Sequence, residues 1–216
     1  MKRFAFLIAA VTPIALSPAI ATTELESYDK IEPIEWPKRP RPSIQLGSIE
    51  TQEDGPIETR TAFISAHFTL VSENAPNWEP AKSAQARYSL YLQDKGAPDL
   101  TLAISVFAKD EFLSDLSEGQ WIRYVAYVEN QPEQPRSITF QHDSQVKRAA
   151  PILLDKRYRQ LEYEFINREG VPRKTRELFT FIGNELVAFT LNGPKEDIER
   201  LRQRHNLFFT RMNRLD

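Results

Sequence analysis

Apolar residues alternate with polar ones along several short runs of this chain, and this period of two constrains the fold more than any other feature. In residues 61–71 the even positions are apolar, and similar alternation returns in 88–92, 100–106 and 161–165. A period of two sends successive side chains to opposite faces of a β-strand. The sequence therefore predicts a chain built mainly from strands, each with one face turned to a core.

Two turns are expected to join neighbouring strands into antiparallel hairpins. The segment 94–99 contains Gly, Pro and Asp residues that favour a reversal between the two alternating runs that flank it. Gly183 and Asn184 form a two-residue loop in which both residues tolerate a positive φ. This loop links 175–182 to 186–191, and the second run is almost entirely apolar, as expected of a central strand.

Two segments have helical features. Ser117, followed three residues later by Gln120, has the form of a capping box and predicts a helix that ends before the prolines within 130–135. A final helix is expected to begin at Gly193 and Pro194, because proline is tolerated in the first turn. Its apolar stripe recurs at steps of three and four and predicts one continuous helix laid against the sheet. The stripe consists of Ile198, Leu201, His205, Phe208, Met212 and Leu215.

The order of these elements resembles that of PsbP-like domains, most closely over residues 178–214, where the hairpin and the terminal helix lie. The resemblance implies an α+β fold: a mostly antiparallel sheet flanked by helices, an α/β/α sandwich, with the C-terminal helix packed on the sheet. It also implies a non-catalytic domain that binds a protein partner or a ligand. It transfers no catalytic residue to this chain.

Residues 1–21 have the features of a signal peptide. A positive start is followed by a mostly apolar run over 4–16, and Ala19 and Ala21 have the spacing of a signal-peptidase site. The run is shorter than the roughly 20 residues of a membrane helix, which disfavours an uncleaved anchor. The mature chain is therefore expected in the periplasm or outside the cell, cleaved after Ala21 and without a transmembrane segment.

Residues 22–60 are predicted to form an extended, proline-rich arm ahead of a single domain over 61–216. The prolines of 31–42 fix φ and remove backbone donors, so this stretch should be semi-rigid. The arm is interpreted as a linker or tail, and the alternative is a docking peptide. The contacts of such a peptide would be Trp36, Lys38, Arg39 and Arg41.

Composition disfavours several chemistries. The sequence contains no cysteine, which excludes disulfides, thiolate metal sites, cysteine nucleophiles and a lipid-bearing cysteine within it. No phosphate loop, dinucleotide fingerprint, G-x-S-x-G or H-E-x-x-H motif occurs, and a formal net charge of −2 argues against nucleic acid. No cofactor and no metal are therefore predicted.

Three histidines and one pair of carboxylates are candidate site residues. His67 is expected on a strand face, His142 at a strand end, and His205 packed at the edge of the core, with no spacing that brings them together. Glu162 and Glu164 share a strand face and could form an acid pair. The favoured interpretation is that both carboxylates are solvated, near Arg157 and Arg159.

Two further groups of side chains could bind a partner or a ligand. The exposed face of the final helix carries arginines that could meet an anionic partner, although a solvated face is favoured. They are Arg200, Arg204 and Arg211. Aromatic residues could line a cleft between helix and sheet, with core packing as the alternative. They are Trp78, Trp121, Tyr88, Tyr91, Tyr124 and Tyr127.

The sequence as a whole predicts an exported, non-catalytic binding or accessory protein that acts on a protein or small ligand of the envelope. One alternative is a hydrolase-type enzyme with a carboxylate or histidine site. Another is a structural envelope component that docks through its proline-rich arm.

Overall fold

The computed structural model describes most of the chain from residue 34 onward. The described residues are 34, 41–51, 58–72, 77–81, 88–131, 136–143, 158–210 and 212–215. The chain divides into the units Met1–Glu32 and Pro33–Asp216, and all described residues lie in the second. The predicted signal peptide lies outside them, as do Trp36, Lys38, Arg39, Arg157 and Arg211.

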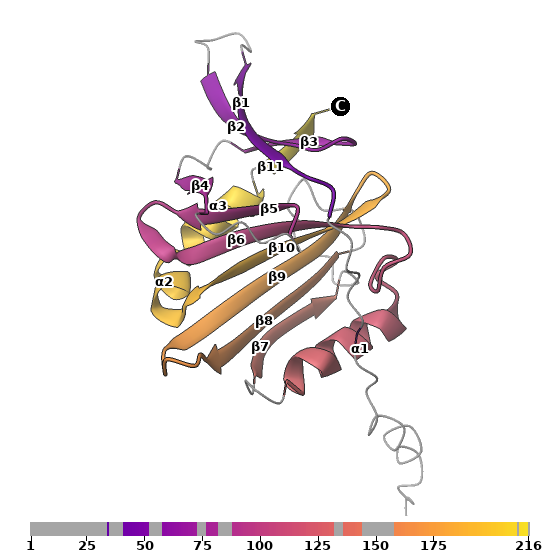
Figure 1. Cartoon of the computed structure of the whole chain (residues 1–216), viewed down its shortest axis with the longest axis vertical. Helices are drawn as coiled ribbons and strands as arrows, with labels where there is room; N and C mark the ends of the chain where they lie inside the picture. The colour runs from indigo at the N-terminus through magenta and orange to yellow at the C-terminus, as the bar shows by residue number, and fades with distance from the viewer. Residues whose placement is uncertain are drawn as a thin grey trace, which may run out of the picture. The chain divides into compact units, whose positions relative to one another are not determined.

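The described residues form two antiparallel sheets and three helices (Figure 1). One sheet contains β4 (Trp78–Pro80), β5 (Leu90–Asp94), β6 (Ala97–Phe107), β7 (Ser137–Asp143), β8 (Tyr158–Ile166), β9 (Pro172–Ile182) and β10 (Glu185–Pro194). The other contains β1 (Gln45–Thr51), β2 (Glu58–Ile64), β3 (Thr69–Ser72) and β11 (Met212–Leu215). The helices are α1 (Glu118–Glu129), α2 (Lys195–Arg200) and α3 (Arg202–Thr210). The predicted α+β class is confirmed.

The seven-stranded sheet has the order β4-β5-β6-β10-β9-β8-β7, so the nearly all-apolar β10 lies in its interior, as predicted. Side chains of β10 alternate between two cores. Val187, Phe189 and Leu191 belong to the core that also holds Ile198 of α2. Leu186 and Ala188 belong to a second core with α1, so the helices cover opposite faces of the sheet.

Helix α1 forms where the capping box predicted it. The hydroxyl of Ser117 accepts a hydrogen bond from the backbone N–H of Gln120 at 3.4 Å, which satisfies one of the free donors of the first turn. Trp121, Tyr124 and Val128 are buried against the sheet. The period of two describes strands and does not predict that Tyr124 of this helix points toward the sheet. Tyr124 is part of the candidate site.

The predicted C-terminal helix is broken at Leu201 and is wrong over its last residues, although the prediction that a helix packs on the sheet is confirmed. Leu201 separates α2 from α3, and its N–H bonds the carbonyls of Asp197 and Glu199. Met212 and Leu215, expected in the helical stripe, lie in β11, which pairs with β3. Met212 is fully buried there. Its apolar side chain fills the core from a strand because β3 offers a free edge for pairing.

The alternating run 61–71 forms two strands instead of one. Ser65 ends β2, and its hydroxyl accepts hydrogen bonds from the N–H groups of His67 and Phe68 at 3.1 and 3.0 Å. Such a serine-centred turn competes with strand continuation. His67 therefore lies in a turn and not on a strand face, and its side chain is 67% exposed.

The structure also differs from the extended arm predicted over 22–60. Residues of β1 and the start of β2 fall within that span and pair antiparallel with each other. Ile34 and Ile44 are buried, and Leu46 packs against the core. The apolar side chains that intersperse this polar, proline-rich stretch are what attach it to the domain.

Candidate functional site

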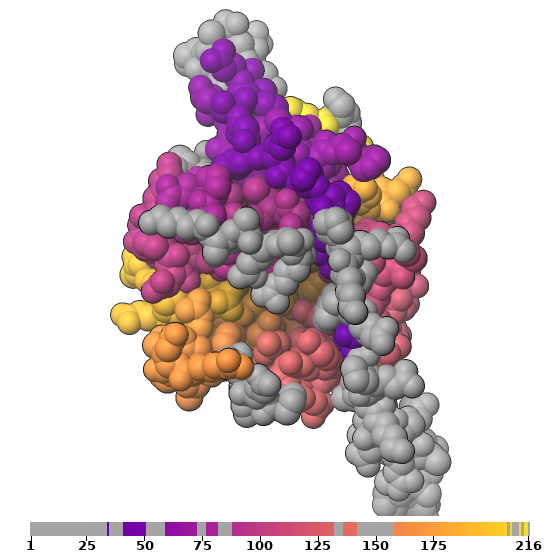
Figure 2. Space-filling view, viewed as in Figure 1, coloured from indigo at the N-terminus to yellow at the C-terminus, as the bar shows by residue number. Residues whose placement is uncertain are grey.

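A cavity of about 690 Å³ opens on the α1 face of the seven-stranded sheet. Part of its floor is formed by short side chains of two adjacent strands, Ala103 and Ser105 of β6 and Ala188 and Thr190 of β10. Cavities of ~300–1,000 Å³ hold small organic ligands. Figure 2 shows this face of the molecule with β5 and β6 in magenta and α1 in salmon.

Aromatic rings form the walls of the cavity. The rings of Tyr88 and Tyr91 stack with centroids 5.4 Å apart and an interplanar angle of 11°. Those of Tyr124 and Tyr127 on α1 lie 6.4 Å apart. The aromatic residues that line the cavity are Tyr88, Tyr91, Phe107, Tyr124, Tyr127, Tyr163, Phe165 and Phe179.

Four of the six aromatic residues that the sequence offered for a cleft thus line this cavity. The other two, Trp78 and Trp121, are buried in the cores on opposite faces of the sheet, as the alternative interpretation required. Sequence periodicity cannot separate the two groups. It indicates on which face of a helix or strand a residue lies, but not whether another element covers that face.

The carboxyl group of Glu177 lies at the bottom of this aromatic enclosure. Its Oε2 accepts a hydrogen bond from the hydroxyl of Tyr124 at 2.7 Å, and its Oε1 accepts one from Tyr163 at 3.2 Å. Burial raises the pKa of Glu177 to about 7, against the opposing effects of both tyrosines and of Arg136. Burial and the nearby carboxylate also raise the pKa of each tyrosine, so both hydroxyls remain donors.

No motif in the sequence singles out Glu177. Its position in β9 places it on the same face as Thr175 and Phe179, and that placement could have been read from the period of two. The signal for a buried carboxylate was a charged residue on the same strand face as a core phenylalanine, Phe179.

Three arginines line the cavity and differ in their partners. Arg41 forms an ion pair with Glu111 at 2.6 Å, and its guanidinium stacks over Phe107 with 4.3 Å to the ring centroid. Arg173 donates to Asn192 Oδ1 at 2.8 Å and to the carbonyl of Asp99. Arg41 was predicted as a partner contact of the arm, and the structure places it against its own domain.

Arg136 is the third arginine. Its guanidinium carbon lies 5.0 Å from the ring centroid of Tyr163 and 5.7 Å from that of Phe165. Within the described part of the chain it makes no side-chain hydrogen bond or ion pair, and its Nε is buried without a partner.

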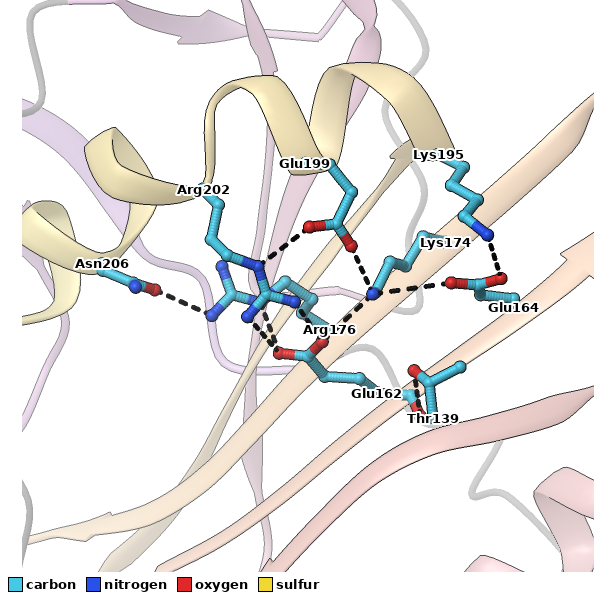
Figure 3. Close-up of polar contacts among 9 residues, drawn as sticks. All are labelled: Thr139, Glu162, Glu164, Lys174, Arg176, Lys195, Glu199, Arg202 and Asn206. Carbon is cyan, nitrogen blue, oxygen red and sulfur yellow. Dashed lines mark hydrogen bonds and ion pairs between the residues drawn. The ribbon is translucent and has the colours of Figure 1, made fainter. Parts of the chain in front are cut away.

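The opposite face of the sheet carries a cluster of ion pairs, shown in Figure 3. Glu162 of β8 contacts Arg176 at 2.8 Å and Arg202 at 2.7 Å, and Lys174 at 3.4 Å. Glu164 contacts Lys174 and Lys195. The cluster connects β8 and β9 to the two C-terminal helices, and its groups neutralise one another.

The expectation that Glu162 and Glu164 lie on a solvated face near Arg159 is therefore wrong. Their side chains are 9% and 25% exposed, and Arg159 instead lies over the ring of Trp121. Burial disfavours the charge of Glu162, but Arg176 and Arg202 outweigh it and lower the pKa of Glu162. Two of the cations that pair with these carboxylates lie on α2 and α3, far from β8 in the sequence: Lys195 and Arg202.

The arginines predicted on the final helix are separated. Arg200 is exposed and pairs with Asp197 of the same helix. Arg204 is hydrogen-bonded to the buried Asp94 of β5. Neither lines the cavity that contains Arg41.

The histidines do not converge. His205 is 2% exposed and stacks on Trp78, which agrees with the packed position predicted for it. The side chain of His142 lies outside the described part. Among the described residues no group of three or more His, Cys, Asp or Glu could hold a metal ion, and no helix has the length and apolar character needed to cross a membrane.

Fold and cavity together define an α+β domain with a ligand-sized cavity on one face of its main sheet. No protein-family model matches the chain, and no curated protein matches its sequence. Among solved structures it is similar to cyanobacterial PsbP from Synechocystis sp. PCC 6803, at 15% identity and a TM-score of 0.47, over 68% of this chain and 85% of that one.

Two further structures are similar in fold. LpqN of Mycobacterium tuberculosis, involved in cell envelope biogenesis, is 11% identical with a TM-score of 0.45 over 80% of this chain and 92% of its own. The Saccharomyces cerevisiae Ran-binding protein Mog1p is 9% identical with a TM-score of 0.41 over 78% and 96%. The predicted resemblance to PsbP-like domains is confirmed for the fold alone, so function is argued from the cavity.

Proposed function

We propose that this protein is an exported, non-catalytic accessory protein that binds a small organic ligand in the cavity beside α1. The observation that carries the proposal is the cavity itself: about 690 Å³, walled by stacked tyrosines and floored by short side chains of β6 and β10. Concave, largely aromatic sites with a few polar groups are the usual form of small-molecule sites.

Polar groups on the floor are available to such a ligand. The hydroxyls of Ser105 and Thr190 make no hydrogen bond to other side chains or backbone groups of the described residues, although Ser105 is buried. Buried polar groups are almost always hydrogen-bonded, to protein or to a bound molecule. Two adjacent strands thus present hydroxyls to the space where a ligand would lie.

The same geometry supports binding over hydrolysis. Glu177 is the one carboxylate among the described lining residues, and both of its oxygens accept hydrogen bonds from tyrosines. For hydrolysis, a hydroxyl such as that of Ser105 or Thr190 would need a base that activates it, and neither makes a hydrogen bond to Glu177 or to a histidine among the described residues. His67 and His205 are not among the lining residues.

The structure offers less support for docking through the arm. Ile34, Arg41 and Ile44 of the predicted arm contact the domain of the same chain. Side chains used in this way are occupied within the domain, which favours the ligand-binding proposal.

The proposal is tested by titrating the purified protein with N-phenyl-1-naphthylamine, an uncharged aromatic probe whose fluorescence rises in apolar sites. We expect saturable binding that Thr190→Trp weakens at least about tenfold, because the indole would fill the cavity from its floor. Gln141→Trp, at an exposed position of β7, is the matched control and should bind as the native protein does. Absence of saturable binding, or equal binding by Thr190→Trp, would refute the proposal.

A further inference from the structure

We infer that the ligand of this cavity carries an acidic group, and that the guanidinium of Arg136 binds this group beside the rings of Tyr163 and Phe165. The inference rests on the proposed function, since it assigns the chemical class of the ligand to the same cavity. The expected ligand is a planar or aromatic carboxylate, sulfonate or phosphate.

Arg136 lines the cavity with a guanidinium whose hydrogen-bonding capacity is not satisfied. Its guanidinium stacks near two aromatic rings, at 5.0 and 5.7 Å from their centroids, which orients its plane. Its Nε is buried and has no hydrogen-bond partner. The guanidinium lines the cavity and is only partly buried, so a ligand can reach its other N–H groups, which have no acceptor among the described residues, and an acceptor there would be stabilising.

The two other arginines of the lining each have oxygen acceptors. Arg41 has an oxygen of Glu111 and the carbonyl of Val106 as acceptors. Arg173 has the amide oxygen of Asn192 and the carbonyl of Asp99. Within the described part of the chain, Arg136 is the lining guanidinium without an oxygen partner.

The charge of the enclosure also favours an anionic ligand. Glu177 accepts its hydrogen bonds from Tyr124 and Tyr163 and forms no hydrogen bond or ion pair with Arg136, whose charge acts on it only at longer range and lowers its pKa, so this carboxyl group is not the missing partner. Burial raises the pKa of Glu177 to about 7, so much of its negative charge is absent at neutral pH. The lining is therefore net positive, and a guanidinium fork pairs well with a carboxylate, sulfonate or phosphate.

The aromatic walls define the remainder of the ligand. Tyr88 and Tyr91 present a stacked pair, and Tyr163 lies beside Arg136. Rings stack favourably on planar apolar bodies. A ligand with a planar body and one acidic group would satisfy both the walls and the free guanidinium.

The test compares two probes that share one scaffold. 1-Anilinonaphthalene-8-sulfonate is N-phenyl-1-naphthylamine with one added sulfonate, so their difference in affinity isolates the acidic group. We expect the sulfonate to bind about tenfold or more tightly at low salt, and Arg136→Met to remove that difference while the uncharged probe binds within twofold of native. Arg136→Lys should retain part of the preference.

Arg200→Met, which removes an exposed arginine of α2, is the matched control and should leave both affinities unchanged. Near-UV circular dichroism identifies variants with native packing, and Arg136→Gln replaces Arg136→Met if the latter does not fold. If the uncharged probe binds but the sulfonate binds no more tightly, or Arg136→Met weakens both probes equally, the inference is overturned while the proposed function stands. If neither probe binds, both fail.

Discussion

Glu177 is buried under two tyrosine hydroxyls, and its protonation makes stability depend on pH. Burial raises its pKa from an ordinary 4.5 to about 7. A carboxyl group whose pKa is raised on folding stabilises the fold below the unfolded value, and that contribution is lost as pH rises through the folded value. We expect Glu177→Gln to be more stable than native at pH 8 by on the order of 3 kcal/mol, since each pKa unit corresponds to about 1.4 kcal/mol.

The measurement is the free energy of unfolding in urea between about pH 4.5 and pH 8. The native protein should lose stability across this window, and Glu177→Gln should show a flatter profile. Glu129→Gln, at the exposed end of α1, is the control and should follow the native slope. An unchanged slope in Glu177→Gln would contradict the assignment.

His205 provides a second residue-scale prediction. Its ring is buried against Trp78, and neither ring nitrogen has a hydrogen-bond partner. Burial and the charges of Arg204 and Arg176 lower the pKa of His205 to about 3, so it is a neutral aromatic residue in the fold. We expect His205→Phe to stabilise the protein by about 1–2 kcal/mol at pH 7, because it removes two unpaired polar atoms.

That gain should grow as pH falls from 6.5 toward 3. The unfolded chain binds a proton on this imidazole in that range, whereas the folded chain does not, so the native protein loses stability there. Urea unfolding at pH 7 and pH 5 measures the effect. His67→Phe, in the exposed turn, should change stability by less than about 0.5 kcal/mol. A destabilised His205→Phe would show that the imidazole makes a needed polar contact.

These two residues show where sequence reasoning succeeded and where it stopped. The helical stripe indicated that His205 packs inward, and its burial agrees. The period of two could place Glu177 on a face of β9 but not report that the face is enclosed by Tyr124 of α1 and Tyr163 of β8. Enclosure depends on elements distant in sequence.

At the scale of elements, the ion-pair cluster on the opposite face holds α2 and α3 to the sheet. Glu162 contacts three cations, Lys174, Arg176 and Arg202, and its side chain is 9% exposed. Removing one charge from a buried cluster leaves its partners unpaired and costs ~3–5 kcal/mol. We expect Glu162→Gln to destabilise the protein by about 3 kcal/mol in urea unfolding.

Glu164→Gln is the matched comparison on the same strand. Its carboxylate is 25% exposed and one of its two partners, Lys195, is about half exposed, so the loss should stay near 1 kcal/mol. Equal losses in the two variants would show that burial does not set the strength of this cluster.

Elements with strong local signals were predictable, and those fixed by long-range pairing were not. The β9–β10 hairpin follows from Gly183 and Asn184, and Gly183 has a φ of +63°. No turn residue or alternation marks β11 in the sequence. Met212 fits the helical stripe, and it fits equally well in a strand paired with β3. The choice between helix and strand was made by an edge about 140 residues earlier in the chain.

At the scale of the whole molecule, the two faces of the seven-stranded sheet differ, because the face of α1 carries the candidate cavity. On one face, residues of the smaller sheet and of both C-terminal helices join a core with the main sheet. On the other face α1 packs on one core, and the short side chains of β6 and β10 leave a cavity beside it. Both faces thus contribute a core, and the cavity lies on the face of α1.

A ligand-binding role outside the cytoplasm requires that the first residues act as a removable signal. Ala19 and Ala21 have the small-x-small spacing that signal peptidase needs. In a bacterial host we expect the chain in the periplasm or medium, with the intact mass of a protein that begins at Thr22. Ala19→Asp should leave the precursor uncleaved and membrane-associated, whereas Ile20→Ser, between the two small residues, should be processed normally. Native protein retained at full length in the cytoplasm would refute export.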